Sequence, residues 1–127
     1  MSKIAVAIVV SDGRVLMVRR RQKEGALHWQ FPSGSVETGE TQIDAAKRET
    51  LEETDVDCKP VRVLGERIHP NTGHEMAYVL CEYVKGNAIV KDKDELDRVE
   101  WMAPSEISKA VTTDIFPPVK EFLQSLI

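Results

Sequence analysis

Residues 31–56 read FPSGSVETGETQIDAAKRETLEETDV, and this stretch determines what the rest of the chain has to support. Its second half brings Glu49, Glu52 and Glu53 close together in the sequence. Side chains three and four positions apart share one face of a helix, so Glu49 would lie beside both other glutamates. Like charges at this spacing destabilise a helix by about 0.2–0.5 kcal/mol per pair. Together with Glu40, one loop earlier, the cluster indicates a site for a cation.

The same stretch predicts a helix from about Gln42 to Thr54. Thr41 is a good N-cap residue, with an acidic residue three positions later. Ile43, Ala46 and Thr50 fall on one stripe of this helix, and we expect them to face the core. The glutamates fall on the adjoining stripe.

Runs of β-branched and aliphatic residues predict strands elsewhere in the chain. These runs are residues 4–10, 14–18, 61–68, 76–84 and 98–102. The first two flank a Ser-Asp-Gly turn and should form a hairpin. Short helices are expected after Pro104 and over residues 119–126. Without repeats or a linker, these elements predict a single α/β domain over residues 1–127.

Composition excludes some classes of function. The chain has 127 residues, a net charge of −4 and a pI near 5.4, which argues against binding to nucleic-acid backbones. Cys58 and Cys81 have no metal-binding spacing and are expected to be buried thiols in a reducing compartment. The apolar run at residues 4–10 is too short to span a bilayer, so we expect a cytoplasmic protein with no membrane contact.

A charged loop is predicted between the second strand and the acidic stretch. It contains Arg19, Arg20 and Arg21, followed by Lys23 and Glu24. Three consecutive arginines form either a solvated strand end or a contact for an anion, because the arginine fork suits phosphate oxygens.

The acidic residues predict a particular chemistry. Several carboxylates that converge on one point need a counter-charge, and Mg²⁺ or Mn²⁺ prefers oxygen ligands. Such an ion, shared with substrate phosphates, neutralises their charge and activates water. The alternative is a solvated acidic helix with no ligand. The first interpretation predicts metal-dependent hydrolysis of a phosphate or pyrophosphate.

The spacing of these residues resembles the signature of the Nudix hydrolases, GX5EX7REUXEEXGU, in which U is a bulky aliphatic residue. The matching positions are Gly34, Glu40, Arg48, Glu49, Glu52 and Glu53. Trp29 and a late strand with Trp101 extend the resemblance over most of the chain. Thr50 departs from the pattern at an aliphatic position. Asp55 stands in place of glycine, and aspartate tolerates the left-handed conformation better than most residues.

The resemblance implies an α/β/α sandwich with a mixed sheet and a loop–helix–loop catalytic motif. It implies roles for the following metal ligands: Glu49, Glu52, Glu53, Glu40 and a backbone carbonyl near Ser33. Arg48 would orient the glutamates and act in catalysis with Glu52 and Glu53. The general base would be either a helix glutamate or an acid among Asp92, Asp94 and Glu95, with Glu95 the first choice.

The substrate implied is a nucleoside diphosphate linked to another group, such as a nucleoside triphosphate. Candidate substrate contacts are Arg19, Arg20, Trp29 and Ser35. Val119 and Lys120 stand where MutT-type enzymes place an asparagine after the Phe-Pro-Pro segment, so we do not expect a dedicated oxidised-dGTP hydrolase. A catalytically silent nucleotide-binding or sensor module is the alternative. We expect a monomer or homodimer.

Overall fold

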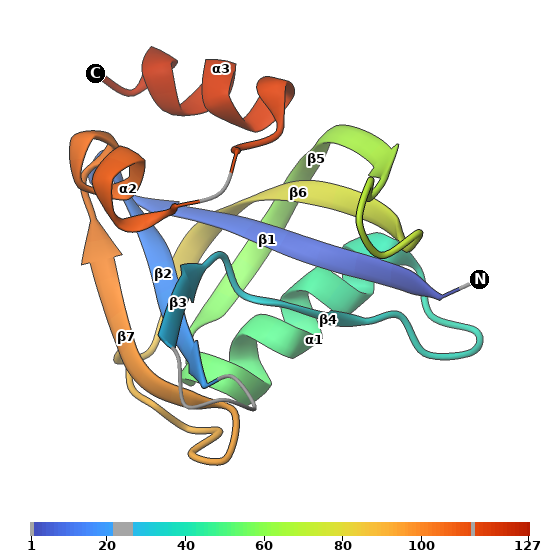
Figure 1. Cartoon of the computed structure of the whole chain (residues 1–127). Coiled ribbons are helices and arrows are strands. Elements are labelled where there is room, and N and C mark those ends of the chain that lie inside the picture. Colours follow the sequence, from blue (N-terminus) through green and yellow to red (C-terminus); the bar gives the residue numbers. More distant parts are fainter. Residues whose placement is uncertain (1, 22–26, 113) are drawn as a thin grey trace.

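Strand β1, Lys3–Ser11, lies at the centre of a mixed sheet in the computed structural model, which describes residues 2–21, 27–112 and 114–127 (Figure 1). The strand order is β3-β2-β1-β6-β5, with β4 also paired to β1 and β7 to β2. The pair β1–β6 is parallel and the other pairs are antiparallel. The other strands are β2 (Arg14–Arg21), β3 (Leu27–Gln30), β4 (Ser33–Ser35), β5 (Asp57–Ile68), β6 (Glu75–Lys85) and β7 (Leu96–Met102).

Helices cover both faces of this sheet. They are α1 (Gln42–Thr54), α2 (Pro104–Ala110) and α3 (Pro117–Ser125), and Figure 1 shows α1 on the face opposite α2 and α3. Successive residues of β1 point to opposite faces. Ala5 and Ala7 therefore pack in the α1 core, whereas Val6 and Ile8 pack in the core below α2 and α3. The predicted α/β/α arrangement is confirmed, and burial on both faces explains the apolar run of β1.

Helix α1 begins and ends where the sequence predicts. The Thr41 hydroxyl accepts a hydrogen bond of 3.1 Å from the Asp44 amide, and Asp55 ends the helix in the left-handed conformation with φ 62°. The expectation for Ile43 is wrong, since this residue lies in the first turn and is 41% exposed. Ala46 and Thr50 are buried as expected, and Ala45 is buried as well, because small side chains let the helix approach the sheet closely.

The predicted hairpin is confirmed, with Val10 opposite Val15. The loop predicted at Arg19–Arg21 is wrong, because β2 continues through these residues and pairs there with β3. Lys23 and Glu24 lie outside the described residues. The short strands β3 and β4 were not predicted, because their sequences are too short to show an alternating pattern. They are strands because they pair with β2 and β1.

Two smaller expectations concern the cysteines and the membrane. Cys58 and Cys81 are free thiols and both are fully buried in the α1 core. Among the described residues, no helix has the length and apolar character needed to cross a membrane.

Candidate active site

The acidic side of α1 faces the short strand β4. Glu53 is only 4% exposed, and its Oε1 accepts a hydrogen bond of 3.2 Å from the Ser33 amide. The Glu49 carboxylate packs so tightly against Gly34 that a Cβ atom at this position would overlap it. Glu52 is different, with a side chain that is 57% exposed. Glu53 and Glu49 therefore contact β4, whereas Glu52 lies on the same side of α1 and is open to solvent.

Arg48 ties the acids of α1 to the preceding loop. It binds both carboxylate oxygens of Glu40, from Nε at 2.7 Å and from Nη2 at 2.9 Å. Its Nη1 donates to Glu49 at 2.8 Å and to Glu52 at 3.1 Å. Its Nη2 also donates to the Ser35 carbonyl at 3.0 Å. One guanidinium thus fixes the loop, the end of β4 and two of the glutamates.

The charges in this network shift the pKa values of the acids in opposite directions. The hydrogen bonds from Arg48, supported by the Glu37 amide, lower the pKa of Glu40 to about 2. Burial raises the pKa of Glu49, although Arg48 opposes the shift. Burial also raises the pKa of Glu53, against the neighbouring Arg20. Glu40 therefore stays ionised, whereas an added positive charge would stabilise the ionised forms of Glu49 and Glu53.

Arg20 reaches the same site from β2. Its Nη2 donates to Glu53 Oε2 at 2.7 Å and to the Ser33 carbonyl at 3.0 Å. Its Nε donates to the Gln30 side chain at 3.0 Å. In this state Arg20 binds the acidic site itself and supplies the counter-charge of a carboxylate that is almost completely buried.

The loop before β7 is tied to the end of α1. The amides of Lys91 and Asp92 donate to the Glu53 carbonyl at 3.1 and 3.4 Å. Glu95 is exposed; its amide donates to Asp92 Oδ1 at 3.3 Å, and its carbonyl accepts from the Arg21 amide at 2.9 Å. The structure thus brings the loop that carries Glu95 to the acidic helix, through its backbone.

The remaining predicted substrate contacts lie in different surroundings. Arg19 forms a two-point ion pair with Asp97, at 2.8 and 2.6 Å, and its guanidinium lies 5.6 Å from the centre of the Trp29 ring. Asp97 and Arg19 shift each other's pKa, lowering that of the acid and raising that of the base. Ser35 is exposed at the end of β4. Trp29 lines a cavity.

This cavity has a volume of about 750 Å³ and lies on the face of the sheet that carries α2 and α3. We call it the aromatic cavity, after four of its lining residues: Trp29, Phe31, Tyr78 and Phe116. Ser33 also lines it, so the cavity reaches the strand that contacts Glu53. Its volume is within the usual range for small-molecule sites, about 300–1,000 Å³.

The donor set has the chemistry of a site for a hard divalent cation. Carboxylate oxygens and the Ser33 carbonyl supply oxygen ligands only, which Mg²⁺ and Mn²⁺ prefer. The glycine at position 34 leaves room for the Glu49 carboxylate. Within residues 2–21, 27–112 and 114–127, no group of three or more acidic, histidine or cysteine side chains is arranged to hold an ion. The carboxylates instead bind Arg20 and Arg48.

Comparison with known proteins identifies the fold and the family. The NUDIX domain matches residues 1–126. The chain belongs to the Nudix family. A crystal structure of a NUDIX hydrolase from Nitrosomonas europaea superposes with a TM-score of 0.82 over 98% of this chain and 70% of that one, at 20% identity, and so has the same fold.

Two curated relatives share part of their sequences with this Nudix domain. An octanoyltransferase from Myxococcus xanthus is 35% identical over 112 residues, which cover 80% of this chain and 30% of that protein. An RNA pyrophosphohydrolase from Stenotrophomonas maltophilia is 39% identical over 62 residues, which cover 49% of this chain and 29% of that protein. The chain thus matches less than a third of the length of either relative.

Several residues near the site had no signal in the sequence. Gln30 binds Arg20, and Arg67 stacks on Tyr78 and Phe116 in the wall of the aromatic cavity. Gln30 occupies the variable position beside Trp29, and Arg67 lies in a strand with no motif around it. Phe116 carried a partial signal, since it belongs to the Phe-Pro-Pro segment that was compared with MutT-type enzymes.

Proposed function

We propose that this Nudix domain is a Mg²⁺-dependent pyrophosphohydrolase, also served by Mn²⁺, that acts on a nucleoside triphosphate or a similar small nucleotide. The observation that carries this proposal is the position of β4. Glu53 and Glu49 of α1 contact Ser33 and Gly34, and Ser33 also lines the aromatic cavity. A nucleotide in this cavity can therefore place its phosphates beside the acids.

The roles of the residues follow from their contacts. Glu49, Glu52, Glu53 and the Ser33 carbonyl would hold the metal ion. Such an ion would neutralise the phosphate charge and activate the attacking water. Arg48 positions Glu49 and Glu52 through Nη1. Because both oxygens of Glu40 bind Arg48, we assign Glu40 to holding that arginine rather than to a direct metal contact.

Glu95 is the proposed general base. Its loop is anchored to the Glu53 carbonyl by two backbone hydrogen bonds, so it stays next to the metal ligands while the exposed side chain remains free to reach a water molecule. A general base must come within hydrogen-bond reach of the proton it removes, often only after the substrate has bound.

Small nucleotides fit this chain better than RNA. One relative is an RNA pyrophosphohydrolase, which makes a pyrophosphate linkage a reasonable target. The net charge of −4 offers little attraction to a nucleic-acid backbone. The catalytically silent alternative is disfavoured because every acid of the signature is retained.

A hydrolysis screen tests the proposal. Nucleoside triphosphates, ADP-ribose, dinucleoside polyphosphates and capped RNA are incubated with Mg²⁺ or Mn²⁺, and released phosphate and pyrophosphate are measured. Glu52→Gln and Glu53→Gln should each lower kcat by orders of magnitude, with the thermal unfolding curve still cooperative. Glu121→Gln is the control, because Glu121 is exposed on α3, on the face of the sheet opposite α1 (Figure 1). Wild-type turnover in Glu52→Gln or in Glu53→Gln refutes the assignment.

A further inference from the structure

The aromatic cavity contains a fixed hydrogen-bond donor that the reaction does not require. Arg67, in β5, lies with its guanidinium 4.8 Å from the centre of the Phe116 ring and 5.7 Å from that of Tyr78. Its Nε donates to the Tyr78 hydroxyl at 3.2 Å. The two rings also pack on each other, with centroids 4.8 Å apart. Stacking and one hydrogen bond therefore hold the arginine fork in the cavity wall.

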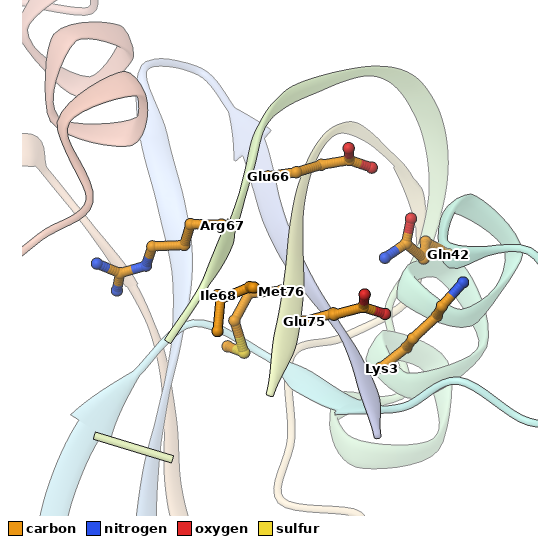
Figure 2. Close-up of a pocket in the computed structure, with 7 residues that line it drawn as sticks. All are labelled: Lys3, Gln42, Glu66, Arg67, Ile68, Glu75 and Met76. Atoms are coloured by element: carbon orange, nitrogen blue, oxygen red, sulfur yellow. The ribbon is translucent and has the colours of Figure 1, made fainter. Parts of the chain in front are cut away.

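The free end of this fork is available to a ligand. Among the described residues, Nε is the only guanidinium nitrogen of Arg67 with a hydrogen-bond partner. Arg67 also borders a second cavity of about 300 Å³, but Figure 2 shows its side chain pointing away from Lys3, Gln42 and Glu75, which line that cavity. Arg67 therefore serves the aromatic cavity, where Nη1 and Nη2 can donate to an acceptor.

Asp114 supplies an acceptor in the same cavity. It lies in the segment between α2 and α3 and lines the aromatic cavity together with Arg67. In the described part of the chain no ion pair joins Arg67 to Asp114, so neither group neutralises the other directly. The cavity thus combines flat aromatic walls with the two terminal nitrogens of Arg67 as donors and the Asp114 carboxylate as acceptor.

We infer that Arg67 and Asp114 act on the nucleobase that the proposed function places in the aromatic cavity, and that they select a base with both a ring carbonyl and an exocyclic amino group, namely guanine or cytosine. This inference rests on the proposed function. The walls stack on the base, Arg67 donates to the carbonyl and an adjacent ring nitrogen, and Asp114 accepts from the amino group. Adenine lacks the carbonyl that Arg67 would bind, and uracil presents a carbonyl oxygen to the Asp114 carboxylate where cytosine presents an amino group.

The test compares four substrates and two variants. We expect kcat/KM for GTP or CTP to exceed that for ATP and UTP by at least about 10-fold in the wild type. Arg67→Lys keeps the charge but loses the fork, and Asp114→Asn exchanges one acceptor oxygen for a donor. Each should reduce this preference about 10-fold, mainly through KM. Arg62→Gln, an exposed position on the same strand, should leave the preference unchanged.

Binding of GMP, CMP, AMP and UMP, measured by calorimetry, separates this inference from the proposed function. Selective binding without hydrolysis of any nucleotide refutes the proposed reaction but supports the base site. The inference is overturned if hydrolysis shows no base preference or a preference for ATP or UTP. It is also overturned if both Arg67→Lys and Asp114→Asn keep full selectivity. Asp114 is exposed, so its variant keeps the test decisive if the Arg67 variant unfolds.

Discussion

Arg20 of β2 donates from Nη2 to Oε2 of Glu53 in α1 at 2.7 Å, and the same nitrogen lies 3.0 Å from the Ser33 carbonyl. These two oxygens belong to residues that we propose as metal ligands. A guanidinium group and a divalent cation therefore compete for the same acceptors. We therefore expect Arg20 to stabilise the protein without metal and to release Glu53 when the ion binds.

Replacing Arg20 tests this competition. Arg20→Gln leaves the buried Glu53 carboxylate without its ion-pair partner, which should destabilise the metal-free protein by about 3 kcal/mol. Added Mn²⁺ should raise the Tm of the variant more than that of the wild type and should bind it more tightly in calorimetry. Arg14→Gln, at the exposed start of the same strand, is the control. An equal rise in Tm and an equal Kd in variant and wild type would show that Arg20 and the metal ion do not compete.

Gly34→Ala should damage the site more than the fold. The added Cβ would overlap the Glu49 carboxylate and displace it from β4. Because a displacement of about 1 Å in a catalytic group can cost 100-fold, we expect kcat to fall about 100-fold. Gly13→Ala is the matched control: it has φ +73° and open space around the new methyl group, so it should lower Tm and leave kcat unchanged. Full activity of Gly34→Ala would contradict the assigned place of Glu49.

The Glu40–Arg48 ion pair predicts a pH dependence of stability. In the folded protein the pKa of Glu40 is lowered from 4.5 to about 2. The contribution of this pair is therefore fully present above pH 4.5 and is lost as the pH falls from 4.5 to about 2. Glu40→Gln should be less stable at pH 7 and should lose less further stability over that acidic range. Urea unfolding at several pH values measures this difference.

The control for this prediction is Glu121→Gln, an exposed change on α3, which should retain the wild-type pH curve. If Glu40→Gln also follows the wild-type curve between pH 4.5 and 2, the pair with Arg48 does not contribute to stability.

Glu95→Gln tests the general base. Loss of a general base typically costs about 100- to 10,000-fold, so kcat should fall by this amount while metal binding is retained. Asp94→Asn, in the same exposed segment, should remain near wild type. If Asp94→Asn or Asp92→Asn loses activity and Glu95→Gln does not, the base has been assigned to the wrong residue.

Prediction from sequence was most successful for α1. The helix runs from Gln42 to Thr54 with the cap at Thr41, because capping and helical periodicity depend on residues within a few positions of one another. It failed for Ile43 and for the arginines of β2. Whether a residue at the edge of a stripe is buried, or a charged run continues a strand, depends on neighbours from other elements.

The sequence by itself determined the two-faced β1 strand, the helix with its caps, and the set of glutamates with the Nudix spacing. These features are local, since each follows from the order and period of adjacent residues. Only the tertiary structure decided that Glu53 is buried against Arg20, that Gly34 packs on Glu49, and that Arg67 and Asp114 share one cavity. These contacts join distant parts of the chain through strand pairing and helix packing, which no local pattern records.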